Sequence, residues 1–182
     1  MASVQMATWS SDFGRRYTDR NPQDWAAMDA LYTSMYGVPR SAVNAEILAG
    51  IDRGAAVLEV GCNVGCQLEG LRAMGFSNLT GLELQEYAAA RARARLPGVT
   101  IVTGSALELP FPDASFDLVY TSGVLIHIAP ADLPRAMREI ARVSRRFVWG
   151  WEYFAPELVE IPYRGQAGLL WKAPYAELYR AE

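Results

Sequence analysis

The stretch VLEVGCNVGCQL, residues 57–68, decides the fold. It begins with an apolar run broken only by Glu59, a pattern typical of a central parallel strand covered on both faces. In the turn that follows, Gly61 and Gly65 flank Asn63, and glycine and asparagine both tolerate a left-handed backbone. A buried strand, a glycine-rich turn and a helix in succession indicate the first unit of an α/β domain, where ligands bind beyond the carboxyl ends of the strands.

Strand and helix patterns alternate on both sides of this stretch. The predicted helices are 40–51, 65–74, 86–95 and 131–143, and the predicted strands are 56–61, 79–84, 99–103, 116–122 and 146–153. Alternation of this kind requires long crossovers, which are nearly always right-handed and produce a parallel sheet with helices on both faces. The expected fold class is therefore α/β, doubly wound, with a mainly parallel sheet.

The chain is expected to form one structural domain with a helical N-terminal lid segment, residues 1–39, and a main ligand-binding part, residues 40–182. In the lid segment, the apolar side of a helix is expected to be buried through Trp25, Leu31, Tyr32 and Met35, with a cofactor-contacting set as the alternative. The helix predicted at 40–51 is expected to begin at Ser41 as its cap and to bury a stripe of Val43, Ile47, Leu48 and Ile51.

Composition excludes several classes of protein. Of the 182 residues, 51% are hydrophobic and 20% are charged, as in an ordinary globular protein, and the net charge of −3 gives no field for holding a nucleic acid. Cys62, Cys66 and His127 do not make a structural zinc set, so no metal is expected. No apolar run reaches about 18 residues. We therefore expect a cytoplasmic protein with no nucleic-acid or membrane partner.

Two carboxylates near the predicted ligand edge indicate the chemistry of the ligand. A dinucleotide fingerprint needs glycine at 61, 63 and 66, but Asn63 and Cys66 occupy two of these positions. Glu59 precedes the turn, and Glu83 lies at the end of the second strand, where a carboxylate accepts hydrogen bonds from ribose hydroxyls. This pattern favours a ligand with an ammonium group and a ribose but no pyrophosphate, and S-adenosylmethionine meets that description.

These residues resemble the class I S-adenosylmethionine-dependent methyltransferases, whose first motif is similar to E/D-x-G-x-G-x-G and whose second strand ends in an acidic residue. The resemblance covers residues 56–150 and includes GSALELPFPDASFDLVYTSGVLIHI, residues 104–128, although the family usually has Asp where Ser105 stands. The motifs FGRRYTDRN, VLEVGCNVG, GVLIHI and VEIPYRG together look like methylases associated with pseudaminic acid biosynthesis. This second resemblance implies an acceptor from a sugar-acid or sugar-nucleotide pathway.

The resemblance implies a set of cofactor-binding residues along the predicted strand ends. They are Glu59, Gly61, Cys62, Asn63, Gly65, Glu83, Leu84, Ser105, Ala106, Leu107, Thr121, Ser122 and Gly123, with Ser105, Ala106 and Leu107 flanking the adenine. From the lid segment, Tyr17 and Arg20 are expected to meet the methionine carboxylate, with plain packing of this segment as the alternative.

Four residues are candidates for acceptor chemistry. His127 follows the fourth strand and is a candidate general base, and the alternative is a packing or orienting histidine. Glu152 and Tyr153 end the fifth strand and are expected to shape the acceptor pocket, unless they lie on the surface. Arg164 lies in a PYRG turn that suits an anionic acceptor, and the alternative is a solvated loop arginine.

The sequence thus predicts an enzyme that transfers the methyl group of S-adenosylmethionine to an oxygen or nitrogen of a small, polar, anionic acceptor, leaving S-adenosylhomocysteine. Two alternatives remain open at this point: a cofactor-binding accessory protein without acceptor chemistry, and a nicotinamide-dependent oxidoreductase. The failed glycine spacing at Asn63 and Cys66 disfavours the oxidoreductase.

The C-terminal stretch differs from that of the family. Class I methyltransferases commonly end their sheet with an antiparallel hairpin, but after residue 154 the sequence predicts only a loop and a short helix in KAPYAELYRAE. The fifth strand would then expose an apolar edge with Phe147, Val148, Trp149 and Trp151. We therefore expect either a truncated form of a longer protein or a homodimer that completes this edge.

Overall fold

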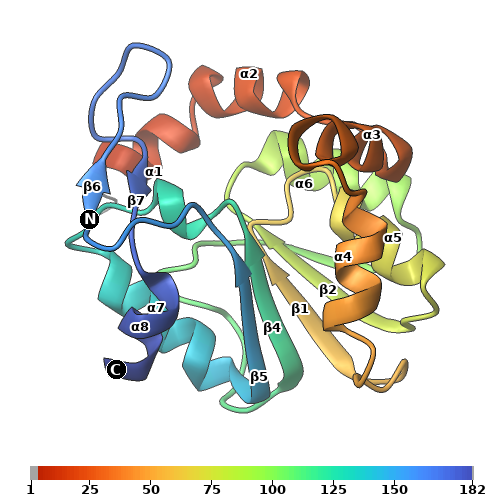
Figure 1. Ribbon diagram of the computed structural model, residues 1–182. Helices are drawn as coiled ribbons and strands as arrows, with labels where there is room; N and C mark the ends of the chain where they lie inside the picture. The colour runs from red at the N-terminus through yellow and green to blue at the C-terminus, as the bar shows by residue number, and fades with distance from the viewer. Residues whose placement is uncertain (1–3, 182) are drawn as a thin grey trace.

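A five-stranded parallel sheet forms the centre of the computed structural model, which describes residues 4–181 (Figure 1). The strands lie in the order β3-β2-β1-β4-β5. Their bounds are β1 Ala56–Val60, β2 Asn78–Glu83, β3 Thr100–Thr103, β4 Phe116–Ser122 and β5 Ser144–Trp151. From β1 the sheet continues through β2 and β3 on one side and through β4 and β5 on the other, so it is doubly wound, as predicted. Ligands are expected at the carboxyl end of β1, where the strand order reverses.

Helices cover both faces of the sheet. Their bounds are α4 Arg40–Ile47, α5 Cys66–Ala73, α6 Glu86–Arg95, α7 Leu133–Val143 and α8 Tyr175–Ala181, with a single 3₁₀ turn, η1, at Leu125–His127. One apolar cluster joins Val57 and Leu118 of the sheet to α5 and α6, and a second joins Leu58 and Val119 to α7. Alternate residues of each strand therefore face opposite clusters, which explains the continuously apolar strand sequences.

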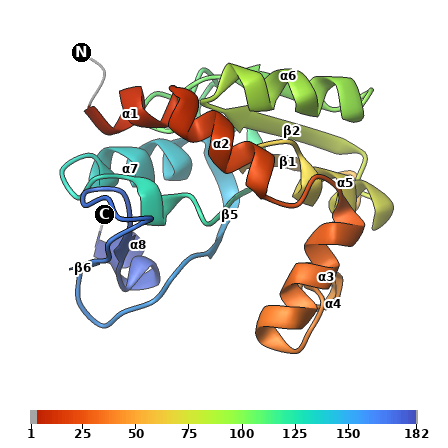
Figure 2. The same ribbon diagram turned by 90° about the horizontal axis from the view of Figure 1, so that it is seen from above.

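Three helices precede this core: α1 Val4–Trp9, α2 Asp12–Arg20 and α3 Trp25–Tyr36. Figure 2 shows α1 and α2 running across one end of the sheet, while α3 lies beside α4 and projects from the rest of the molecule. The expectation of a buried apolar side in α3 is wrong, because α3 has no buried residue. Its aromatic and aliphatic side chains are only partly covered, since the helix packs at one flank of the domain and not across the core.

The helix predicted at 40–51 also differs from the expectation. It begins one residue before Ser41, with Pro39 at the cap position and no capping side chain, and it buries Arg40 and Asn44. Of the predicted stripe, Leu48 is buried, but Ile47 is 44% exposed. The inward face is polar because the Arg40 guanidinium packs on Trp149 and hydrogen-bonds to Asn44, and sequence periodicity gives no sign of such a pair.

The chain beyond β5 contains a two-residue antiparallel pair, β6 Val159–Glu160 with β7 Trp171–Lys172, in a sheet of its own. The expectation that this stretch holds only a loop before its short helix is therefore corrected. This pair does not extend the main sheet: Leu170 and Tyr175 join the apolar cluster on the α7 face. As predicted, β5 remains an edge strand of the main sheet.

Candidate active site

A cavity of about 360 Å³ lies at the carboxyl ends of the strands, at the predicted ligand edge. The strand-end segments that line it are 59–64, 82–85, 104–107 and 122–124, together with 126–128 of the η1 turn. Helices α1, α2 and α3 contribute the opposite wall. The cavity is thus enclosed between a sheet edge and a helical N-terminal segment that is distant in sequence.

The turn after β1 brings backbone close to the cavity. Gly61, Asn63 and Gly65 all have positive φ, at 76°, 48° and 79°, which confirms the interpretation of Asn63 as a residue in the left-handed region. A Cβ on Gly61 would lie 2.5 Å from Val124 Cγ2, and the Gly61 amide donates to the Leu82 carbonyl at 2.7 Å. No side chain larger than hydrogen fits at Gly61 without displacing the β4–η1 connection.

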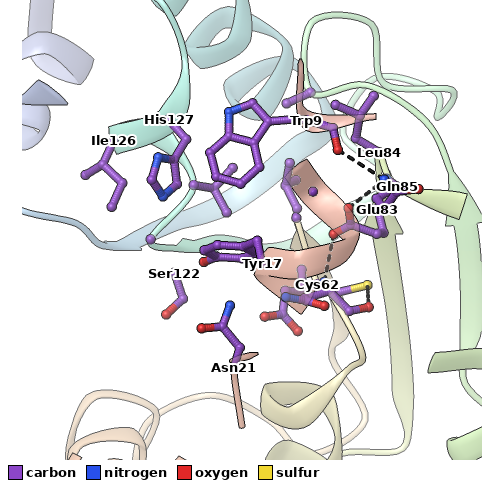
Figure 3. Close-up of a pocket in the computed structure, with 18 of the residues that line it drawn as sticks. Trp9, Tyr17, Asn21, Cys62, Glu83, Leu84, Gln85, Ser122, Ile126 and His127 are labelled. Carbon is purple, nitrogen blue, oxygen red and sulfur yellow. Dashed lines mark hydrogen bonds between the residues drawn. The ribbon is translucent and has the colours of Figure 1, made fainter. Parts of the chain in front are cut away.

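Glu83 is held rigidly at the end of β2. Its carboxylate accepts a hydrogen bond from the Asn63 amide and another from the Gln85 amide, each at 2.8 Å (Figure 3). Burial raises the pKa of Glu83, and the two amide donors act in the opposite direction. Two donors leave further acceptor capacity on the carboxylate, which suits a pair of ribose hydroxyls.

Glu59 supplies the second carboxylate of the cavity lining. Its Oε2 and the Oδ1 of Asn63 are buried without a hydrogen-bond partner in the described part of the chain. Burial raises the pKa of Glu59 to about 8, since the charged form loses its hydration. Buried acceptors without donors, as in Glu59 and Asn63, call for a donor-bearing ligand. With the remaining acceptor capacity of Glu83, they fit the ammonium and ribose of S-adenosylmethionine.

Most residues expected at the cofactor site do line the cavity. These are Tyr17, Glu59, Gly61, Cys62, Asn63, Glu83, Leu84, Ser105, Ala106, Leu107, Ser122 and Gly123. Gly65, Thr121 and Arg20 do not. Gly65 instead caps α5, where a Cβ would meet Leu96 Cδ1 at 2.5 Å, and Thr121 is buried within β4. Arg20, at the end of α2, is exposed, which corrects the expectation that it meets the cofactor.

Glu152 holds the loop that carries His127. The prediction that Glu152 shapes the acceptor pocket is therefore wrong. Its carboxylate accepts hydrogen bonds from the Val124 amide at 3.0 Å and the Ile126 amide at 3.3 Å. Burial raises its pKa, and hydrogen bonds from Thr121 and these amides oppose that shift. Glu152 is therefore a positioning residue for η1, while its neighbour Tyr153 lines the cavity as expected.

Arg164 lies outside the cavity lining, exposed in its turn with φ of 53°. Its guanidinium carbon is 5.7 Å from the ring centre of Tyr163, and it is Tyr163 that faces the site, 5.2 Å from the His127 ring. The expectation that Arg164 grips an anionic acceptor is corrected by this position. The left-handed backbone at Arg164 turns its side chain away while the preceding tyrosine points inward.

His127 lines the cavity just beyond β4, as predicted. Its Nδ1 lies 2.7 Å from the Leu169 carbonyl oxygen, which accepts only, so Nδ1 carries the proton and Nε2 is the free acceptor. Burial lowers the pKa of His127 to about 4, so the imidazole is neutral at pH 7. The ring also contacts Trp9, with centroids 4.5 Å apart, and Figure 3 shows both rings in the cavity with Tyr17.

Side chains that sequence patterns did not predict hold α1 over this site. The Gln5 side chain donates to the His127 carbonyl and accepts from the Ala129 amide, while Gln85 donates to the Trp9 carbonyl at 3.2 Å. Gly14 permits this packing, because a Cβ there would lie 1.8 Å from the Trp9 oxygen. The one sequence signal was a glycine inside the helical pattern of 12–20, which indicates close approach of another backbone.

Among residues 4–181, no three His, Cys, Asp or Glu side chains gather as a metal site would require. Within the same range, each helix is too short or too polar to cross a lipid bilayer.

Comparison with known proteins supports the interpretation of this site. Residues 58–146 match the family model described as a methyltransferase domain. Sterol 24-C-methyltransferase ERG6B of Gibberella zeae is 38% identical over 102 residues, which are 53% of this chain and 26% of that protein. The chain thus spans about a quarter of this relative's length.

Solved structures are similar over a larger part of the chain. An S-adenosylmethionine-dependent methyltransferase from Mesorhizobium loti is 25% identical, with a TM-score of 0.51 over 67% of this chain and 60% of the other. The PH0226 protein of Pyrococcus horikoshii has the same fold, with 20% identity and a TM-score of 0.63 over 78% of this chain and 80% of that one. Residues 58–146 thus match a methyltransferase domain in sequence, and the fold is that of the S-adenosylmethionine-dependent methyltransferases.

Proposed function

We propose that this protein transfers the methyl group of S-adenosylmethionine to an oxygen or nitrogen of a small acceptor, with His127 as general base. The observation that carries the proposal is the hydrogen bond between His127 Nδ1 and the Leu169 carbonyl. It holds the imidazole in the tautomer whose Nε2 accepts a proton. When bound, the cofactor supplies an electrophilic methyl group, so positioning the acceptor and removing one proton supply the remaining catalysis.

Glu59, Asn63 and Glu83 hold the cofactor in this proposal, because all three line the cavity and carry side-chain oxygens that accept hydrogen bonds. Residues 1–39 act as the lid, with Trp9 and Tyr17 covering the site. The negative charge predicted for the acceptor relied on Arg164 as its partner, and Arg164 lies outside the cavity lining. The sugar-pathway acceptor, implied by the resemblance of four motifs to pseudaminic acid-associated methylases, stays a prediction.

The test is a mass-shift screen of candidate acceptors, incubated with the protein and S-adenosylmethionine, with His127→Ala in parallel. We expect products heavier by one methylene and a loss of about 10²- to 10⁴-fold in turnover for the variant, with cofactor affinity nearly unchanged. Binding without any methylated product would favour the accessory-protein alternative. Full activity of His127→Ala would remove the histidine from the mechanism.

A homodimer through β5 also belongs to this proposal. Phe147 and Val148 of this edge strand are 43% and 38% exposed, and an uncovered apolar edge favours pairing with a second chain. Light scattering at micromolar concentration tests it. We expect a dimer that Val148→Lys dissociates, and a wild-type monomer would contradict the proposal.

A further inference from the structure

Helix α3 presents apolar side chains to the cavity that the described part of the chain leaves partly uncovered. Leu31, Met35 and Tyr36 are 40%, 55% and 44% exposed, and all three line the cavity. The helix buries no residue, so these side chains contribute little to the core. A contiguous apolar wall beside a site is a common sign of ligand contact.

An aromatic corner, defined as Tyr32, Tyr36 and Trp151, completes this wall. The ring centres lie 5.3 Å apart for the two tyrosines, and each tyrosine ring is 5.8 Å from the Trp151 ring. All three residues line the cavity. Trp151 pairs with Ser122 across β4 and β5, so the corner stands beside the strand end from which the loop to His127 departs. An acceptor resting on these rings would therefore lie next to the reacting end of the site.

Arg40 fastens the corner from behind. Its guanidinium carbon is 5.0 Å from the Tyr32 ring centre and 4.9 Å from that of Trp151, and its Nη1 donates to the Tyr32 hydroxyl at 2.9 Å. Arg40 has no exposed surface, so it does not reach the cavity itself. The rings are thus held in place before any ligand arrives, which lowers the entropy cost of binding against them.

The side chains that line the cavity offer an anion no cationic partner. Glu59, Glu83 and Asp132 line it, whereas no lysine or arginine among residues 4–181 does, and the Arg40 guanidinium behind the corner is already hydrogen-bonded to Tyr32 and Asn44. An anionic acceptor would lose its hydration there without a hydrogen bond from a cationic side chain, which is costly. The corner and the α3 wall instead offer surfaces that suit a flat, uncharged ring.

We infer that the acceptor is an uncharged aromatic molecule whose ring packs on the aromatic corner and whose hydroxyl or amino group faces His127. This inference rests on the proposed methyl transfer and adds the acceptor class to it. Met35 and Leu31 line the α3 side of the ring site, and the buried Arg40 keeps Tyr32 and Trp151 in place.

The test uses 2-naphthol as an uncharged probe and 2-naphthoate as its anionic counterpart. Calorimetry first measures S-adenosylhomocysteine binding to the full chain, and each probe is then titrated into protein saturated with that product. We expect 2-naphthol to bind about tenfold or more tightly than 2-naphthoate, a difference of about 1.4 kcal/mol. Equal affinities, a preference for 2-naphthoate, or no binding of 2-naphthol would overturn the inference.

Two matched variants locate the probe. Met35→Lys places a cation on the α3 wall, and Ile47→Lys places the same charge on a neighbouring helix, at a residue that is also exposed but outside the lining. We expect Met35→Lys to weaken 2-naphthol and strengthen 2-naphthoate about threefold each, and Ile47→Lys to change neither. Identical behaviour of the two variants would overturn the assignment of the wall. Absence of S-adenosylhomocysteine binding, with the same probe preferences in protein titrated without it, would refute the proposed function and leave the ring site standing.

Discussion

The cofactor side and the acceptor side of the cavity are built in different ways. The cofactor side comes mainly from one continuous βαβ stretch, residues 57–85, in which backbone amides and carboxylates meet over short loops. The acceptor side joins α1, α2 and α3 to the η1 turn, Trp151 and Tyr163. Local chain geometry therefore positions the first side, whereas long-range packing positions the second. A substitution on one side should leave ligand binding to the other side measurable, so the two sides can be tested separately.

The largest expected effect is on the acceptor side, with Arg40→Ala. This change removes a fully buried guanidinium, its hydrogen bonds to Tyr32 and Asn44, and its stacking on Trp149 and Trp151. We expect the free energy of unfolding to fall by about 3 kcal/mol or more, because a cavity and unpaired polar groups remain. Urea denaturation measures it. A loss below about 1 kcal/mol would mean that long-range packing at Arg40 does not hold the acceptor side together.

Gly61→Val is the matching change on the cofactor side. A β-branched residue at φ of 76° is strained, and its Cβ would meet Val124. We expect cofactor affinity to fall by about 100-fold or more, equivalent to about 2.7 kcal/mol. Calorimetry with S-adenosylmethionine checks this. Wild-type affinity in a folded variant would place the ligand elsewhere.

Glu83→Ala tests the cofactor side with less disturbance of the backbone than Gly61→Val. It removes the acceptor that holds the Asn63 and Gln85 amides and that we assign to the ribose hydroxyls. We expect S-adenosylmethionine binding to weaken by about 1–3 kcal/mol. Binding of 2-naphthol to this variant is the control and should be nearly unchanged, since the aromatic corner lies on the other side. An unaltered affinity for the cofactor would refute the role of Glu83.

The smallest effect is a pH dependence of cofactor binding through Glu59. Its pKa is raised to about 8 by burial, with the Tyr120 hydroxyl and then Arg40 acting to lower it and Glu83 to raise it. A cationic ligand favours the ionised carboxylate, so binding below pH 8 releases a proton. Affinity should therefore rise by up to about tenfold between pH 7 and 8 and level off above that. Calorimetry in buffers of different ionisation enthalpy counts the proton.

Glu59→Gln is the control for this dependence and should abolish it. The same raised pKa makes the stability of the fold change with pH in the opposite direction to cofactor affinity, because the folded protein binds the proton more tightly than the unfolded chain. The contribution of Glu59 to stability is therefore present at low pH and is lost as the pH rises from about 4.5 to about 8. A proton count near zero in the wild-type protein would contradict the assignment of Glu59 to a cationic group.

Sequence alone determined the five strands of the main sheet and the turn at the carboxyl end of β1. Apolar runs bounded by Gly and Asn predict buried strands directly, and α6 at Glu86–Arg95 has the predicted bounds. The places of Glu59, Asn63 and Glu83 followed, because residues that end neighbouring parallel strands meet at one edge. These relations depend on spacing within a short stretch of chain, and spacing is visible in a sequence.

Only the tertiary structure decided the acceptor side. Glu152 supports the β4–η1 loop, and Tyr163 faces the histidine while Arg164 points away from it. Side-chain direction depends on backbone angles and on distant partners, which a sequence does not show. Gln5 reaches His127 across more than a hundred residues, and Arg40 is buried because three aromatic rings enclose it. Hydropathy patterns record the average environment of a residue type, whereas a paired buried cation or a partly exposed apolar wall is defined by neighbours that lie far away in the chain.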